Sequence, residues 1–432
     1  MSDSSNSNVF SNKNFLLTFI GALISDLGAA LYSFAISYYI LDISDNNAFL
    51  QGLYLALCGV ALVISTPIGG VLGDRSNKAK IMFICDLLTG SVVLISAIGI
   101  TYISDHKLQL IILFFVGIAS NILNGFFSPA ASALLPDIVE KDQFQQANAY
   151  FTAKSSLQSI IGIILAGILY STLPVNILFM IVGICYIVSA ISEMFIRYEF
   201  KGAGEKITVR LMITDMADSL NYLKSQKAIT ALLAASLFMN FFVNPVEANF
   251  VPYFIKTDVS SSSDYLFSKA VSPEMWSSIF SVLYAACILI GSLILSSQAP
   301  KEKFGHTTAL RVLQLAVIMI LLTLGYSLFV YSFISLNFLL IIMCLVHIAI
   351  GFVIAFINIP SSTAIMRTVD ENKLSKITSF VTLLAMGITP ISLGIAGAAL
   401  QFSGGLSLLI FCSAGFAITA ICLLLNKHIK EV

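Results

Sequence analysis

Long apolar segments are the feature of this sequence that most constrains what it can fold into. Twelve such segments are separated by short polar breaks, and each is longer than the roughly 20 residues that a helix needs to cross a bilayer. The segments cover residues 14–41, 49–73, 79–103, 108–135, 146–172, 175–197, 227–255, 274–297, 308–331, 336–366, 376–400 and 404–426. Backbone polar groups cannot stay unpaired in hydrocarbon, so each segment is expected to be helical. The sequence therefore predicts an all-α integral membrane protein with 12 transmembrane helices.

The composition agrees with this prediction. Hydrophobic residues make up 58% of the chain and charged residues 11%, which is too little polar surface for a water-soluble protein of this length. The formal net charge is zero, so we expect no nucleic-acid partner. All seven cysteines lie in apolar segments without a C-x-x-C motif, and we expect them to be reduced packing residues rather than metal ligands.

The distribution of basic residues predicts the orientation. If both termini are cytoplasmic, 19 of the 23 Lys and Arg residues lie inside, three lie outside, and Lys154 lies within a span. Both termini are therefore expected in the cytoplasm, with the chain in the cell membrane. Residues 1–13 and 427–432 are expected to be cytoplasmic tails, the first disordered and not a cleaved signal peptide.

The two halves of the chain carry a similar stretch. Pro129 and Pro360 lie 231 residues apart, and each is followed by small residues, bulky apolar residues and a charged turn. Because each half contains six spans, the second copy has the same orientation in the membrane as the first, which makes this a parallel repeat. We expect an N-terminal bundle at 14–197 and a C-terminal bundle at 227–426. The loop 198–226 between them is expected to hold an amphipathic interfacial helix at 212–223.

A short charged stretch, G-G-V-L-G-D-R-S-N-K-A-K, lies between the second and third segments at 69–80. Its charges cannot lie in hydrocarbon, so it predicts a tight cytoplasmic turn, and its glycines allow close helix approach. The stretch resembles the loop 2–3 signature G-x-L-a-D-r-x-G-r-K of the major facilitator superfamily. The matching residues are Gly70, Leu72, Asp74, Arg75 and Lys78, whereas Asn77 stands at the second glycine of the signature.

This resemblance implies two pseudo-symmetric six-helix bundles, the major facilitator fold. It also implies a gating role for Gly70, Asp74, Arg75 and Lys78, which we call the gating loop. The alternative is an ordinary basic loop, because the positive-inside rule alone explains its cations.

Two further stretches, at 126–149 and 215–223, are similar to the macrolide-efflux and siderophore-export branch of the drug/proton antiporters. Three departures weaken a proton relay borrowed from that family. Asn121 stands in place of an arginine in span four, and span five lacks the proline of the exporter pattern G-P-x-x-G-G. Thr89, after Asp86, stands where the branch often has arginine.

Polar side chains form a stripe on four of the spans. A carboxylate at the bilayer centre costs about 2.5–3.5 kcal/mol, so such groups are expected to face protein or water. The resemblance implies that these spans (one, four, seven and ten) line a central cavity. The candidates for substrate or proton binding are Asp26, Ser33, Asn121, Asn124, Asn240, Asn244, Glu247, His347 and Asn358.

Among these candidates, Asp26 and Glu247 are expected to bind protons or a cationic substrate, because a buried carboxylate can be protonated reversibly. The alternative for each is a structural, hydrogen-bonded acid. His347 fits a packing hydrogen bond better than a functional role. Lys154 either pairs with an acid or extends to the interface, and we expect the second.

Outside this set, Glu193 and Arg197 are four residues apart and are expected to form a local ion pair.

No catalytic motif is present: the sequence lacks a P-loop, G-x-S-x-G and H-E-x-x-H. We therefore expect no enzyme activity, no cofactor and no metal. The leading prediction is a monomeric secondary exporter of an amphipathic small molecule (a macrolide-like drug, siderophore or peptide), working by alternating access and proton antiport. Its partners would be the substrate, protons and the lipid bilayer. The alternatives are a translocator of lipids or lipid-linked molecules on the same fold and, last, a non-transporting sensor.

Overall fold

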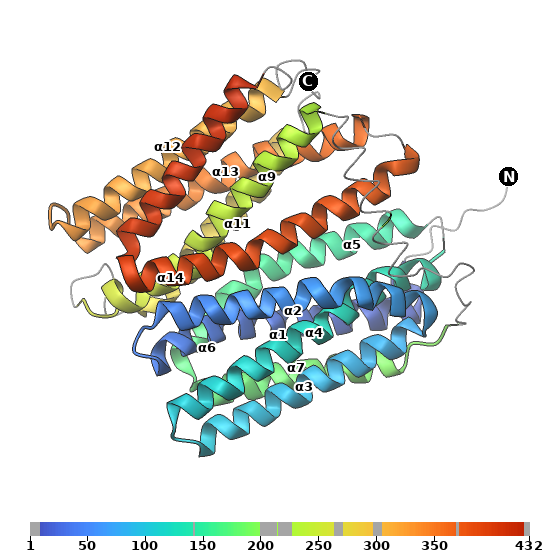
Figure 1. Ribbon diagram of the computed structural model, residues 1–432. Coiled ribbons are helices and arrows are strands. Elements are labelled where there is room, and N and C mark those ends of the chain that lie inside the picture. Colours follow the sequence, from blue (N-terminus) through green and yellow to red (C-terminus); the bar gives the residue numbers. More distant parts are fainter. Residues whose placement is uncertain are drawn as a thin grey trace. The chain divides into compact units, whose positions relative to one another are not determined.

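The computed structural model describes residues 9–140, 143–198, 214, 227–262, 271–296, 305–368 and 371–426. Within these ranges every regular element is a helix, as Figure 1 shows. Ten of the described helices are long and apolar enough to cross a membrane. The predicted all-α membrane architecture is therefore confirmed.

The first six predicted segments are helical. Their helices are α1 (Lys13–Ile43), α2 (Ala48–Arg75), α3 (Lys78–Tyr102), α4 (His106–Ile138), α5 (Phe144–Leu157), α6 (Ile163–Thr172) and α7 (Val175–Met194), preceded by the short η1 (Val9–Ser11). The segment 146–172 is interrupted by η3 (Gln158–Gly162), a π-helical turn between α5 and α6. Such a turn inserts one extra residue and is frequent at functional sites.

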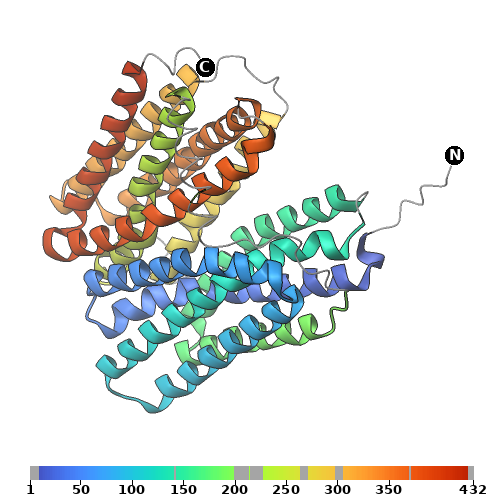
Figure 2. The same ribbon diagram turned by 45° about the vertical axis from the view of Figure 1, so that its right-hand side comes forward.

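The remaining segments are helical as well. Their helices are α9 (Lys227–Pro245), η4 (Val246–Phe250), α10 (Val251–Phe254), η5 (Ile255–Val259), α11 (Pro273–Ser296), α12 (Gly305–Val330), α13 (Leu336–Thr368) and α14 (Glu371–Leu425). The last two predicted segments both lie in α14, whose ribbon reverses direction in Figures 1 and 2. The reversal occurs at Gly404, whose φ of 79° is a conformation that favours glycine.

The chain divides into two compact units. The first comprises residues 1–39 and 60–209, and the second comprises residues 40–59 and 210–432. The repeat and the bounds expected for the two bundles stay predictions, although both repeat prolines do lie inside helices, in α4 and α13. The predicted interfacial helix at 212–223 lies outside the described residues except for Thr214.

In the first unit, α3 packs against both α4 and α7. Gly90 of α3 meets Gly183 and Ile187 of α7, so the two backbones approach closely. Apolar side chains also cover the outside of the unit: Ile95 is 67% exposed and Phe115 is 68% exposed. Such exposure suits a lipid environment, where an apolar outer face costs nothing.

In the second unit, residues 40–59 pack against later helices. Lys256 of η5 lies 2.8 Å from Oδ1 of Asp42 and 2.7 Å from Oε1 of Glu274. Burial works against the charged ammonium, but the two carboxylates outweigh it, so the pKa of Lys256 rises above its ordinary value. Gly52 of α2 meets Gly397 of α14 backbone to backbone. These contacts attach the end of α1 and the beginning of α2 to the C-terminal helices.

Candidate functional site

Asp26, the candidate acid of α1, is paired with Lys154 of α5. The ammonium nitrogen lies 2.5 Å from Oδ2 of Asp26. The side chain of Lys154 is only 7% exposed, whereas that of Asp26 is 31% exposed. Gln158, in the π-helical turn η3, donates to the backbone carbonyl of Asp26 at 3.1 Å. The expectation that Lys154 extends to the interface is therefore wrong, because its charge is neutralised inside the first unit.

The other candidates of the first unit do not join this pair. Ser33 is exposed, and its carbonyl accepts from the Ser37 hydroxyl. Asn121 donates to the Gly117 carbonyl of its own helix at 2.9 Å, and Asn124 is exposed. Among the described residues, none of the three candidates hydrogen-bonds to Asp26. Sequence reasoning thus found the acid but not its partner Lys154, although a lysine inside a span was itself a signal.

In the second unit, Glu247 of η4 faces His347 of α13. Oε1 of Glu247 lies 3.3 Å from Nε2 of the histidine. His347 is 1% exposed and Glu247 is 25% exposed. The ring of Phe280 stacks on the imidazole, with centroids 4.9 Å apart and an angle of 14° between the planes. Glu247 also lies in a π-helical turn, a local geometry that is frequent at functional sites.

The hydrogen bonding of His347 decides what its Nε2 presents to Glu247. Its Nδ1 lies 2.7 Å from the carbonyl oxygen of Met343, which can only accept, so Nδ1 carries a hydrogen. In a neutral imidazole Nε2 would then present a lone pair to the carboxylate. The close approach is favourable only when either Nε2 or Glu247 is protonated. The packing role expected for His347 accounts for its Nδ1, while its Nε2 faces Glu247 without a regular hydrogen bond.

Within the described part of the chain, the remaining candidates of the second unit form no hydrogen bond with this pair and differ in their surroundings. Asn244 donates to the Thr389 hydroxyl of α14 at 3.2 Å. Asn240 is exposed and donates to the Ser236 carbonyl of its own helix at 3.1 Å. Asn358 is exposed, whereas His347, the other candidate on α13, is buried.

The gating loop is shorter than the sequence indicates. Helix α2 continues to Arg75 and α3 begins at Lys78, so only two residues connect them. The ammonium of Lys78 lies 2.5 Å from Oδ2 of Asp137, and its backbone N–H donates to Oη of Tyr198 at 2.8 Å. Lys78 therefore joins the ends of α3 and α4. The side chains of Asp74 and Arg75 lie outside the described part of the chain.

Two residues next to the signature positions have clear structural roles. Asn77 is the N-cap of α3 and accepts a hydrogen bond from the Lys80 backbone N–H at 3.1 Å. Gly69 packs against the backbone of Gly125 and Phe126, while a Cβ on the signature residue Gly70 would meet nothing within 4 Å. The close helix approach expected for this stretch therefore depends on Gly69.

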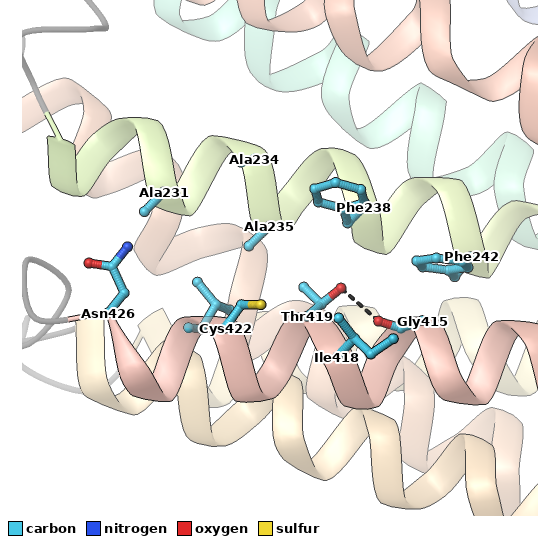
Figure 3. A pocket seen from close by; sticks show the side chains of 11 residues that line it. Ala231, Ala234, Ala235, Phe238, Phe242, Gly415, Ile418, Thr419, Cys422 and Asn426 are labelled. Atoms are coloured by element: carbon cyan, nitrogen blue, oxygen red, sulfur yellow. Dashed lines mark hydrogen bonds between the residues drawn. The ribbon is translucent and has the colours of Figure 1, made fainter.

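An apolar cavity of about 300 Å³ lies between α9 and the last part of α14 (Figure 3). Phe238 and Phe242 line one wall, and Ile418 and Thr419 line the other. The Thr419 hydroxyl donates to the Gly415 carbonyl at 2.8 Å, so it offers little polarity to an occupant. None of the candidate site residues lines this cavity.

Comparison with known proteins gives relatives in one family. A family model described as Major Facilitator Superfamily matches residues 18–393. Macrolide efflux protein A of Streptococcus pyogenes is 24% identical over 285 residues, which are 65% of this chain and 65% of the relative. BacE of Bacillus subtilis, named as a bacilysin exporter, is 27% identical over 191 residues, which are 43% of this chain and 45% of the relative. The chain spans less than two thirds of the length of these relatives.

Solved transporter structures are similar over nearly the whole chain. A crystal structure of a mutant of the peptide transporter POT gives a TM-score of 0.75 at 11% identity, covering 97% of this chain and 95% of that one. A bacterial homologue of the iron transporter ferroportin, in an inward-facing state, gives 0.68 at 13% identity, covering 96% of this chain and 100% of that one. At such identities the likeness shows a shared fold.

Proposed function

The chain belongs to the Major Facilitator Superfamily, and from that premise we propose that it is a proton-driven exporter of an amphipathic small molecule. Family and fold confirm the predicted major facilitator fold, and they make the chain a multi-pass membrane transporter rather than an enzyme. The export direction is proposed from the relatives named for macrolide efflux and for bacilysin export. The proposed substrate class is therefore a macrolide-like drug, a siderophore or a peptide.

The observation that carries the proton coupling is the pair formed by Glu247 and His347. The 3.3 Å approach of Glu247 to Nε2 would be favourable with one proton on the pair, since Nδ1 of the histidine is already committed to Met343. Losing that proton would leave a lone pair facing a carboxylate and would push the two side chains apart. Release of this proton would therefore drive a conformational change in the second unit. A transporter of alternating access needs such a two-state element.

Asp26 is proposed as the second charged element of transport. Its carboxylate is partly exposed while its partner Lys154 is buried, so a cation arriving from solvent reaches the acid first. A cationic amphipath or a proton would compete with Lys154 for Asp26. We also propose a cell-membrane location with both termini cytoplasmic and a monomeric state, supported by the distribution of basic residues for the orientation.

The test is uptake of a radiolabelled macrolide into inside-out proteoliposomes with and without a pH gradient. We expect Glu247→Gln and His347→Phe to reduce gradient-stimulated uptake about tenfold or more, while Glu140→Gln, an exposed acid, leaves it unchanged. Full gradient-driven uptake by both site variants would refute the assignment. Absence of gradient stimulation in the wild type, with a siderophore and a peptide also tried, would refute proton-driven export.

The apolar cavity favours a second candidate function, translocation of a lipid or lipid-linked molecule. Its walls of alanine and phenylalanine suit an acyl chain, and Phe238 is 51% exposed, consistent with access from the membrane. Filling the cavity with Ala235→Trp should then abolish transbilayer movement of a fluorescent lipid in proteoliposomes. Lipid movement that is equal in wild type and variant, or absent from both, would reject this candidate.

A further inference from the structure

The interface between α3 and α7 contains two buried carboxyl groups that the proposed transport cycle does not use. Asp86 is 3% exposed and Glu193 is 1% exposed. The ion pair expected between Glu193 and Arg197 is wrong, because Glu193 is buried at the helix interface and no described residue bonds to its carboxylate, while Arg197 is exposed. Oδ2 of Asp86 likewise accepts no hydrogen bond from a described residue.

A buried hydroxyl points to the same place. Ser189, one turn before Glu193 on α7, is 0% exposed. Its hydroxyl lies close to Asp86 without a regular hydrogen bond to a described residue. Three polar side chains from two helices therefore converge with unused hydrogen-bonding capacity. Buried polar groups are normally paired, so this convergence calls for an occupant.

Among the described residues, the titratable groups that interact with the two acids bring no compensating positive charge. The groups that interact with the two acids are Cys85 of α3, Tyr186 of α7, and Asp26 of α1, while Tyr32 of α1 and Cys185 of α7 interact with Tyr186. Lys154 of α5 is bonded to Asp26. An ionised carboxylate buried without a partner costs several kcal/mol, and a second one beside it adds repulsion.

The occupant must be very small. One turn along α3, Gly90 meets the backbone of Gly183, and a Cβ there would lie only 2.9 Å from the Gly183 carbonyl oxygen. Helices this close leave no room for a hydrated cation. A proton needs no such room and satisfies an acid by turning one oxygen into a donor.

We propose that Asp86 and Glu193 form a proton-binding site inside the first unit, with a proton held on the pair at neutral pH and Ser189 within reach of it. The site involves different residues from the Glu247–His347 pair of the second unit. Proton occupancy of the site does not depend on the proposed function, whereas any contribution to export does.

Infrared spectroscopy of the purified full-length protein at neutral pH tests the proposal. We expect the C=O stretching band of a protonated carboxylic acid, and we expect part of it to be lost in Glu193→Gln and in Asp86→Asn. That part should remain in Glu247→Gln and in the exposed control Glu140→Gln. Unchanged bands in both Glu193→Gln and Asp86→Asn overturn the proposal. A band that disappears on adding sodium indicates a bound metal cation and overturns it as well.

A transport measurement separates this site from the proposed function. If the infrared band is lost in Glu193→Gln but the wild type shows no pH-driven uptake, the proton site stands and proton-driven export fails. If uptake is proton-driven and the band is insensitive to both substitutions, export stands and the proton site fails. Loss of the band together with an altered pH profile of uptake in Glu193→Gln supports both.

Discussion

The ammonium of Lys154 lies 2.5 Å from the carboxylate of Asp26, although 128 residues separate them in the sequence. The two partners differ in burial: Lys154 is 7% exposed and Asp26 is 31% exposed. The lysine also lies over the ring of Phe151, 5.1 Å from its centroid, in a cation–π contact. The pair is therefore asymmetric, since only the carboxylate could regain water if its partner were removed.

This asymmetry predicts different costs for the two neutralising substitutions. Asp26→Asn leaves a buried ammonium without a counter-charge and should lower the free energy of unfolding by about 3 kcal/mol. Lys154→Gln leaves a carboxylate that can reach solvent and should cost about 1 kcal/mol or less. Thermal unfolding of the purified variants in detergent measures both. The double variant should be more stable than Asp26→Asn alone; equal costs for the single variants would contradict the assigned burial.

The helices were predictable from the sequence because hydrophobicity along the chain is a local property. The predicted segments are helical in their described parts, and the last two meet at the non-helical Gly404, next to the break predicted between 400 and 404. Acids and bases inside spans could also be identified singly. Asp26, Glu247 and His347 all prove to be paired, as the cost of unpaired charge in hydrocarbon requires.

The partners of these groups could not be read from the sequence, because they depend on helix rotation and packing. Lys154 could have reached the interface by its own length, and only the fold turns it toward Asp26. Glu193 and Arg197 have the four-residue spacing of a helical ion pair, yet Glu193 lies on the buried side of α7. Asn124 and Asn358 belong to the predicted polar stripes of spans four and ten, but both side chains are exposed and bond to no candidate acid within the described ranges.

Asn77 explains how the chain departs from the loop signature without loss of structure. It caps α3 with backbone angles of φ −64° and ψ 111°, which need no glycine. Asn77→Ala should lower stability by about 1 kcal/mol, and Asn77→Gly, which restores the signature, by only a few tenths. Circular dichroism during thermal unfolding compares them. If Asn77→Gly were less stable than Asn77→Ala, the hydrogen bond accepted by the Asn77 side chain would not account for the stability of this helix start.

The acid Asp258 in η5 predicts a pH-dependent stability. Burial raises its pKa above the ordinary 3.8, although hydrogen bonds from Thr257 and Tyr326 favour the charged form. The folded state then binds the proton more tightly than the unfolded state, so stability falls as pH rises from 3.8 to the folded pKa. Asp258→Asn should remove this fall, and its advantage over wild type should grow across that range.

Thr257→Val is the opposite control for Asp258. It removes the 2.8 Å hydrogen bond that favours the carboxylate, so the fall in stability with rising pH should become larger than in wild type. Thermal unfolding midpoints of the wild type and both variants are to be measured from about pH 4 to 7, a range that begins near the ordinary pKa of a carboxyl group. Parallel curves for the two variants would exclude Asp258 as the titrating group.

Gly69 and the adjacent gating-loop residue Gly70 predict opposite responses to the same substitution. Gly69→Ala places a methyl group against the backbone of Gly125 and Phe126, which cannot move aside locally, and should cost about 2 kcal/mol. Gly70→Ala meets nothing within 4 Å and should leave stability unchanged or raise it by up to about 1 kcal/mol, because alanine is the better helix former. Thermal midpoints of the two purified variants decide this. A destabilised Gly70→Ala variant would contradict the packing of α2 on α4. A stable Gly70→Ala variant that failed to transport would show that the signature glycine is required in another conformation of the protein.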